Sequence, residues 1–197
     1  MKNTLKIISS TYEKYEIPTN YRNKKVELDL GCGKGLFLLN LAKLYPDRLI
    51  LGVDIMLGRL RKLRNKIHLH NLSNAKLLRA SAIELIGYQL QDNSIDRIHF
   101  LCPDPWPKAA HRSKRVFTSE FCGMLTRVLK NEGILHISTD NKNYLDFMKK
   151  SINNSLLYHN YSEGIDDLKD IKTDFEIIWK KEGKKVPHFA YKIKKLK

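Results

Sequence analysis

Three glycines and a nearby aspartate have a spacing that could hold a ligand. In the stretch ELDLGCGKGLF, residues 27–37, the glycines are Gly31, Gly33 and Gly35, and Asp29 stands two residues before the first of them. Glycines allow the backbone to turn tightly and let a ligand approach it closely. The spacing of the lysine is wrong for a P-loop, and no serine or threonine follows it. The loop therefore predicts a cofactor site that is not of the P-loop kind.

The carboxylates around this loop distinguish between cofactors. Asp29 would repel a pyrophosphate, which is the group that NAD places on such a loop, but it would attract a cation. S-adenosylmethionine carries an ammonium and a sulfonium and has no phosphate. Asp54 ends a second apolar run nineteen residues beyond Gly35, where a carboxylate can accept the ribose hydroxyls of either cofactor. Together the two aspartates favour S-adenosylmethionine, although each could instead be a loop or helix cap.

The stretch PDPWPKAAHRSKR, residues 103–115, is a second place where chemistry is expected. Its prolines exclude a helix interior and a central strand, and they restrict the backbone direction of Asp104. An aspartate can read a base edge by accepting from its N–H groups, and basic side chains bind phosphates. The basic residues that follow are Lys108, His111, Arg112, Lys114 and Arg115. The alternative is a solvated charge run beside a structural Trp106.

The overall charge favours a polyanionic partner. The chain has 197 residues, 42% of them hydrophobic, and carries a formal charge of +15 with a pI of about 9.7. Such a charge speeds the capture of polyanions, so nucleic acid is the first partner class and a membrane surface the second. A generally lysine-rich proteome is the alternative explanation. The length predicts a single domain over 1–197, with a short N-terminal extension over 1–23.

The cysteines and the remaining sequence point to a reduced, cytoplasmic protein. There are three cysteines without CxxC spacing, which argues against a disulfide framework and against a zinc site. The N-terminus lacks the apolar core of a signal peptide, and no stretch reaches the roughly 18 consecutive apolar residues of a membrane span. We therefore expect no metal and no membrane association, with the chain a monomer or a homodimer.

Strands and helices are predicted to alternate along most of the chain. Short apolar runs predict strands over 25–30, 49–55, 75–81, 94–102 and 133–140. Helical spacing predicts helices over 36–45, 56–71, 117–130 and 144–152. The segment 175–195 is predicted to be a late hairpin. This alternation is typical of an α/β fold with a mostly parallel sheet and helices on both faces.

In such folds ligands bind at the carboxyl ends of the strands. The predicted strand ends bring together five segments: 29–35, Asp54, Ser81, 102–115 and Asp140. The glycine loop and the proline stretch are thus expected to lie at the same edge of the sheet.

Four motifs at this edge carry a family resemblance. DLGCGKG, GVDI, PDPWPKAAHRSKR and STDN together resemble the bacterial tRNA (guanine-N7)-methyltransferase family, from about residue 24 to the C-terminus. The proline motif is specific, whereas the glycine motif is common to many methyltransferases. The resemblance implies a Rossmann-like class I methyltransferase fold with a mostly parallel seven-stranded sheet and a late antiparallel hairpin. It also implies methyl transfer from S-adenosylmethionine to N7 of a guanine in the tRNA variable loop.

The resemblance also implies roles for individual residues. The implied cofactor contacts are Asp29, Gly31, Gly33, Gly35, Asp54, Ser81 and Asp104, and Asp104 would also be the catalytic residue. The implied substrate contacts are Lys108, Asp140, Thr173, Phe175 and Glu176, the last three from a late TDFE motif. The implied RNA contacts are Ala110, His111, Arg112, Ser113, Lys114 and Arg115. Ser81 departs from the family pattern, which usually has an acid there.

The expected reaction requires no strong base. Guanine N7 has a free lone pair at neutral pH, so the protein has to align N7, the methyl carbon and sulfur, and such orientation can lower the barrier by several kcal/mol. A methyltransferase acting on another RNA or on a small molecule would share the glycine loop, but a small substrate would not require the basic run. A non-enzymatic RNA-binding protein would keep the basic surface without a need for Asp29 and Asp54.

Overall fold

One mixed sheet forms the centre of the computed structural model, which describes residues 4–10, 12–106 and 108–195. The strands are β1 (Leu5–Ile7), β2 (Val26–Leu30), β3 (Leu49–Asp54), β4 (Ala75–Arg79), β5 (Ile95–Leu101), β6 (Leu129–Ser138), β7 (Tyr158–Asn160) and β8 (His188–Ile193). Their order across the sheet is β1-β4-β3-β2-β5-β6-β8-β7. Neighbours from β1 to β6 are parallel, and β8 runs antiparallel to β6 and β7.

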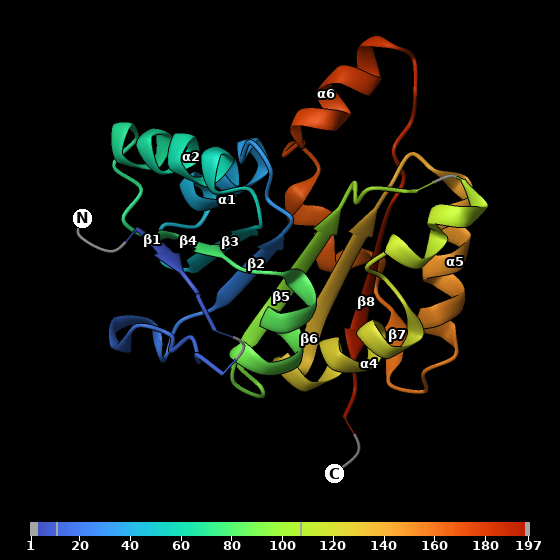
Figure 1. Ribbon diagram of the computed structural model, residues 1–197, viewed down its shortest axis with the longest axis horizontal. Coiled ribbons are helices and arrows are strands. Elements are labelled where there is room, and N and C mark those ends of the chain that lie inside the picture. The colour runs from blue at the N-terminus through green and yellow to red at the C-terminus, as the bar shows by residue number, and fades with distance from the viewer. Residues whose placement is uncertain (1–3, 11, 107, 196–197) are drawn as a thin grey trace.

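Helices cover both faces of this sheet (Figure 1). The longer helices are α1 (Leu36–Leu44), α2 (Leu57–Leu69), α4 (Ser119–Val128), α5 (Lys142–Asn153) and α6 (Asp174–Lys181). The short helical segments are η1 (Thr19–Tyr21), α3 (Ala82–Glu84), η2 (Leu85–Gln89), η3 (Ala109–Lys114) and η4 (Ser162–Leu168). One apolar cluster packs α4 and α5 against the sheet, and a second packs α1 and α2 against it. The predicted α/β architecture with helices on both faces is confirmed.

Among the described residues, the sheet has one strand more than the seven expected. The additional strand comes from the N-terminal segment. β1 pairs in parallel with β4, and Tyr15 and Tyr21 are buried in the core. A strand of three residues is too short for hydrophobic periodicity to reveal it. The described residues of the segment 1–23, expected to be an extension, therefore contribute both an edge strand and core side chains.

The late antiparallel pair is present, but it is formed by β7 and β8 rather than within residues 175–195. The first part of that segment is helix α6. Thr173 caps this helix, and Glu176 completes a capping box by accepting from the Thr173 backbone. This reciprocal pattern starts helices, so the local signal for a helix was in the sequence. Phe175 and Trp179 stack one turn apart on α6, with ring centroids 5.3 Å apart.

Gly35 fixes the contact between α1 and α2, which leads to a stability prediction. Its φ is +81°, and a Cβ placed there would lie 2.3 Å from Leu63 Cδ1. We expect Gly35→Ala to lower the free energy of unfolding by about 2–4 kcal/mol, because both backbone strain and overpacking oppose it. Gly58→Ala is the matched control, since nothing lies within 4 Å of its added Cβ. Urea unfolding that finds equal effects for the two variants would contradict this explanation.

Candidate active site

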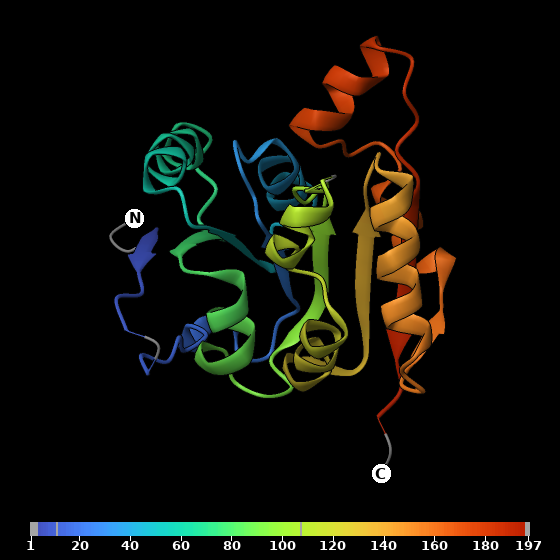
Figure 2. The same cartoon turned by 45° about the vertical axis from the view of Figure 1, so that its right-hand side comes forward.

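The predicted site segments meet at the carboxyl edge of the parallel strands. The glycine loop follows β2, Asp54 ends β3, Ser81 follows β4, the proline loop follows β5 and Asp140 follows β6. In both views α6 stands beyond the same ends of β5 and β6 (Figure 1, Figure 2). The sequence-predicted segments are therefore brought together, and a helix not predicted from the sequence lies over them.

The glycine loop is fastened to β3 and open on its other side. Gly31, Gly33 and Gly35 all have positive φ angles, of 87°, 55° and 81°. The backbone N–H groups of Gly31 and Cys32 both donate to Val53 O, each at 2.9 Å. A Cβ at Gly31 would meet no atom within 4 Å. A ligand can therefore approach the backbone of this loop directly.

Asp29 has a buried carboxylate that pairs with none of the described residues. The residue is 4% exposed, and Oδ2 accepts no hydrogen bond from any residue that the structure describes. Burial first, and then the charges of Asp54 and Asp174, raise the pKa of Asp29 to about 7. A buried carboxylate of this kind is costly unless it is paired. An ordinary loop cap would have its hydrogen bonds made, so the structure favours a ligand that brings a positive charge or N–H donors.

Asp54 connects the glycine loop to the start of α2. Its Oδ2 accepts from Gly33 N at 3.1 Å, and its Oδ1 accepts from Met56 N at 2.7 Å. Arg59 Nη1 lies 3.9 Å from Oδ2. Asp54 is not the N-cap of α2, which is Met56, but its side chain holds the backbone just before that helix. A carboxylate has about four lone-pair sites, so each oxygen can still accept from a ribose hydroxyl.

A pocket lies between the glycine loop and the first turn of α6. It is lined by Asp29, Gly31, Cys32, Gly33, Lys34, Phe37, Arg59, Leu101, Cys102, Thr173, Asp174, Phe175 and Ile178. Asp174 Oδ2 accepts from Leu36 N at 3.2 Å, which ties α6 to the start of α1. Sequence reasoning missed Asp174 in this role. Nothing local in the sequence could have shown it, because Leu36 and Asp174 are 138 residues apart.

The proline loop is held in a strained and braced conformation. Cys102 and Trp106 have φ angles of 50° and 41°, in the region that L-residues seldom adopt. Arg115 Nε donates to Pro105 O at 2.7 Å, and its guanidinium lies 4.7 Å from the Tyr144 ring centroid. Lys114 Nζ lies 4.8 Å from the Trp106 ring centroid. Strain of this kind persists only where surrounding contacts enforce it, as at functional sites.

The side chains of the proline loop divide into exposed and buried groups. The exposed residues are Asp104, Lys108, Ala110, Ser113 and Lys114, and His111 is half-buried. The side chain of Arg112 lies outside the described part of the chain. Arg115, predicted to contact RNA, is 8% exposed and in this structure anchors the loop to Pro105. Among the described basic side chains of the loop, those of Lys108 and Lys114 are exposed.

The remaining candidate residues differ in how accessible they are. Asp140 and Phe175 are exposed and Ser81 is half-buried, whereas Thr173 and Glu176 are buried. Thr173 lines the pocket below α6. The carboxylate of Glu176 is engaged by Thr173 N and by His188 Nε2, each at 2.8 Å. Glu176 therefore holds the start of α6 in place.

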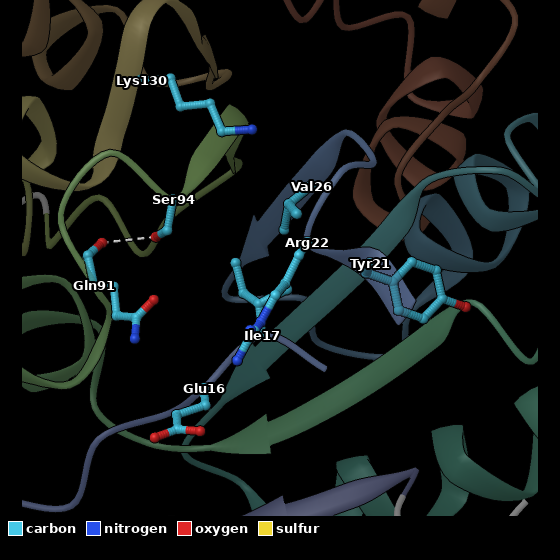
Figure 3. Close-up of a pocket in the computed structure, with 8 residues that line it drawn as sticks. All are labelled: Glu16, Ile17, Tyr21, Arg22, Val26, Gln91, Ser94 and Lys130. Carbon is cyan, nitrogen blue, oxygen red and sulfur yellow. Dashed lines mark hydrogen bonds between the residues drawn. The ribbon is translucent and has the colours of Figure 1, made fainter. Parts of the chain in front are cut away.

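A second pocket lies at the opposite edge of the sheet (Figure 3). It is bordered by Val26, the first residue of β2, and by Ser94, just before β5. Ser94 Oγ donates to Gln91 O at 2.7 Å. None of the residues predicted to bind cofactor or RNA lines it. The pocket at the glycine loop is therefore the candidate active site.

Two further observations come from the described residues alone. They contain no group of three or more histidine, cysteine, aspartate or glutamate side chains arranged to hold a metal ion. Nor do they include a helix that is long and apolar enough to cross a membrane.

Solved structures define the class to which this fold belongs. The aminoglycoside resistance methyltransferase NpmB1 superposes with a TM-score of 0.61 at 21% identity, covering 89% of both chains. The 16S rRNA methyltransferase KamB superposes with a TM-score of 0.62 at 13% identity, covering 89% of this chain and 91% of KamB. The fold is that of a class I methyltransferase.

Sequence comparison narrows this class to a family. The model of the family described as "Putative methyltransferase" matches residues 23–189. A tRNA (guanine-N(7)-)-methyltransferase of Lactobacillus delbrueckii subsp. bulgaricus is 30% identical, with 88% of this chain and 83% of that protein covered. The chain belongs to the bacterial tRNA (guanine-N7)-methyltransferase family, which confirms the resemblance seen in its motifs.

Two other similar tRNA (guanine-N(7)-)-methyltransferases are longer than this chain. The one from Buchnera aphidicola subsp. Baizongia pistaciae is 33% identical over 81% of this chain, and the one from Edwardsiella ictaluri is 30% identical over 79%. The match spans less than two thirds of the length of each, 65% and 66% respectively.

Proposed function

We propose that this protein transfers the methyl group of S-adenosylmethionine to N7 of a guanine in the variable loop of tRNA. The observation that carries the proposal is the buried carboxylate of Asp29, whose Oδ2 has no hydrogen-bond partner among the described residues, just before an open glycine loop. The exposed Asp104 and the basic residues of the proline loop follow the adjacent strand β5. The names of the family members support tRNA guanine as the substrate.

The residues of the pocket fit this cofactor. Asp29 would pair with its ammonium group, and the free lone pairs of Asp54 would accept from the ribose hydroxyls. The glycines allow the cofactor to lie against the backbone, and Ser81 would face the adenine. The cofactor supplies a methyl group on a positively charged sulfur. Phe37, Phe175 and Ile178 line the pocket as well, and such apolar side chains would exclude water from that centre.

The expected role of the protein is orientation rather than proton transfer. N7 of guanine attacks with a lone pair that is free at neutral pH. Asp104 would accept from the N–H groups of the guanine base and hold N7 in line with the methyl carbon. Asp140, at the end of β6, would position the base from the neighbouring strand. Holding reactants in line can lower a barrier by several kcal/mol.

The proline loop would bind the RNA backbone beside the target base. Lys108 and Lys114 are exposed there, and the chain carries a formal charge of +15. The target guanine has to leave its stacked position to reach the pocket, at a cost of a few kcal/mol. Contacts to the flanking phosphates would offset this cost.

A charge-removal experiment tests the role of the proline loop. We expect the double variant Lys108→Ala, Lys114→Ala to bind tRNA more weakly and to reduce the slope of log affinity against log salt by about two, one unit per lost phosphate contact. The control is Lys25→Ala, Lys43→Ala, which removes the same charge from exposed positions at the opposite edge of the sheet. Equal slopes for the two double variants, measured by filter binding, would show that the proline loop does not hold phosphates.

The substrate class is tested by offering alternatives. Transfer of a labelled methyl group from S-adenosylmethionine should occur to tRNA and not to ribosomal RNA or to free guanine nucleosides. Preferential labelling of either alternative would replace tRNA as the proposed substrate.

A further inference from the structure

Three histidine rings form a continuous hydrogen-bonded chain through the sheet. His99 on β5, His136 on β6 and His188 on β8 lie side by side, with His99 Nδ1 3.0 Å from His136 Nδ1 and His136 Nε2 2.8 Å from His188 Nδ1. Each end of the chain meets a carboxylate. His99 Nε2 lies 2.9 Å from Glu27 Oε2, and His188 Nε2 lies 2.8 Å from Glu176 Oε1.

The number of protons that the three histidines and two carboxylates share determines the net charge of the group. The four contacts need four N–H or O–H protons, because each hydrogen bond uses one. Three neutral imidazoles supply only three, and an ionised carboxylate supplies none. If every ring is neutral and each N–H points towards Glu27, then His188 Nε2 and the Glu176 carboxylate are two acceptors facing each other. All four hydrogen bonds along the three histidines form only when the histidines and the two carboxylates together hold one proton more than three neutral rings carry.

The surroundings place the extra proton at the end of the chain near α6. Burial alone would raise the pKa of Glu27, but the hydrogen bond from His99 and the charge of Arg97 lower it, so Glu27 is ionised. Burial lowers the pKa of both His99 and His136, which keeps these two rings neutral. His188 is the least buried of the three rings, with 22% of its side chain exposed, and it faces Glu176 directly.

The other charged groups that the structure describes around the three histidines lie at the two ends of their hydrogen-bonded row. Arg48, Arg97 and Asp167 surround the Glu27 end. At the other end, Lys172 Nζ lies 3.9 Å from Glu176 Oε1, and Asp166 and Lys169 border the same cavity as His136 and His188. Asp166 and Lys169 pair with each other at 3.2 Å. Among the described residues Glu176 is therefore the nearest anion to His188. Burial raises the pKa of Glu176, but the hydrogen bonds from His188 and Thr173 lower it by more, so that the pKa is lowered overall.

The same carboxylate connects the histidine chain to the candidate active site. Glu176 Oε2 accepts from Thr173 N, which fixes the first turn of α6. From that turn Asp174 accepts from Leu36 N at the glycine loop, and Phe175 lines the pocket. A change at His188 is thus transmitted through one carboxylate to the helix that covers the pocket.

We propose that His188 is a positioning residue whose imidazolium form, paired with Glu176, holds the first turn of α6 over the active-site pocket. His136 and His99 orient the His188 ring and fix which of its nitrogens faces Glu176. When the extra proton leaves at higher pH, one of the four hydrogen bonds is lost and α6 is held less firmly. The identification of the pocket as a cofactor site rests on the proposed function, but the proton count does not.

The direction of the pH effect follows from the proton count. The folded form with α6 docked binds one proton more than the form with α6 released, so docking is favoured at low pH and weakens as pH rises. Loss of a charge-assisted hydrogen bond should reduce the protection of the α6 amides by about tenfold. Binding of S-adenosylhomocysteine should weaken in parallel, because only the docked fraction forms the complete pocket.

A substitution at Glu176 separates the effect of the extra proton from the effect of side-chain packing. In Glu176→Gln the amide N–H₂ can donate to a neutral His188 Nε2, while its oxygen still accepts from Thr173 N. The Gln side chain of this variant supplies the fourth proton itself, so all four hydrogen bonds can form at any pH. His188→Leu is the opposite case, because it removes two of the four hydrogen bonds and leaves Glu176 without its ring partner.

The test uses nitrogen-15 NMR of histidine-labelled protein, with amide exchange of residues 174–181, from about pH 6 to about pH 9.5. We expect the exchange protection, corrected for the intrinsic rate, to be highest while wild-type His188 is doubly protonated and to fall about tenfold as that ring loses its proton. Glu176→Gln should show a neutral His188 and pH-independent protection, and His188→Leu low protection throughout.

A wild-type His188 that is neutral throughout this pH range, or protection that does not change while the ring titrates, would overturn the proposal. Failure of the wild type to bind S-adenosylhomocysteine at any pH would contradict the proposed function instead, and the NMR measurements would still decide on His188.

Discussion

Asp29→Asn is expected to weaken the binding of S-adenosylmethionine by at least about 100-fold and, at neutral pH, to stabilise the protein without ligand. The two effects have one cause. Oδ2 of Asp29 is buried and has no partner in the part of the chain that the structure describes, so its charge is costly until a cationic group pairs with it. Breaking a buried charge pair typically costs about 2–5 kcal/mol of binding energy. The amide keeps the shape of the side chain and removes the charge.

The pH dependence of stability checks the same residue. Burial and the nearby Asp54 and Asp174 raise the pKa of Asp29 from its ordinary value of 3.8 to about 7. The folded form therefore retains this proton longer than the unfolded form does, and stability falls as pH rises from about 4 to about 7. Above pH 7 the destabilising contribution is complete. Asp29→Asn should lack this contribution.

Denaturant unfolding at about pH 5 and pH 8, together with calorimetric titration of the cofactor, measures both effects. The control is Asp47→Asn, because Asp47 is exposed at the other edge of the sheet. If Asp29→Asn bound the cofactor as tightly as the control does, the proposed ammonium contact would be wrong.

Asp104→Ala is expected to lower the rate of methyl transfer by about 1,000-fold or more, while the fold and tRNA binding change little. Asp104 is exposed, so its removal leaves no cavity and costs little stability. The residue lies on a strained loop between two prolines, where its direction is determined by the backbone. Removal of one preorganised polar group at a reacting centre typically costs about 10²–10³ in rate. Loss of orientation of the base adds to that cost.

Single-turnover kinetics with saturating tRNA separates this effect from binding. Asp140→Ala is a suitable comparison, since Asp140 is also an exposed aspartate at the same edge, and a positioning role at the neighbouring strand predicts a smaller loss. A variant of Asp104 that retained the wild-type rate but bound tRNA poorly would make Asp104 an RNA contact only.

The site residues that could be predicted from the sequence are those whose positions are determined by a local sequence pattern and by the geometry of a parallel sheet. The glycine loop with Asp29, and Asp54 at the end of β3, are found where alternation of strands and helices places them. The edge location of Asp104, Ser81 and Asp140 follows from the same rule. Each of these predictions depends only on where a strand ends.

The parts that sequence reasoning missed depend on contacts between distant residues. Arg115 belongs to a basic run, yet it packs against Tyr144 and binds the Pro105 carbonyl. The three histidines stand on separate strands without any regular spacing, so only the register of β5, β6 and β8 brings them together. Helix α6 is a different case, because its capping box at Thr173 and Glu176 was readable and the hairpin prediction overlooked it.

Nucleoside mass analysis of tRNA tests the central claim most directly. Unmodified tRNA transcript would be incubated with S-adenosylmethionine and either the wild-type protein or Asp104→Ala, and then digested to nucleosides. We predict that 7-methylguanosine forms with the wild-type protein only, and that mapping of the digested fragments places it in the variable loop. If the wild-type protein binds the cofactor but forms no 7-methylguanosine, methylation of guanine N7 in tRNA is not its function.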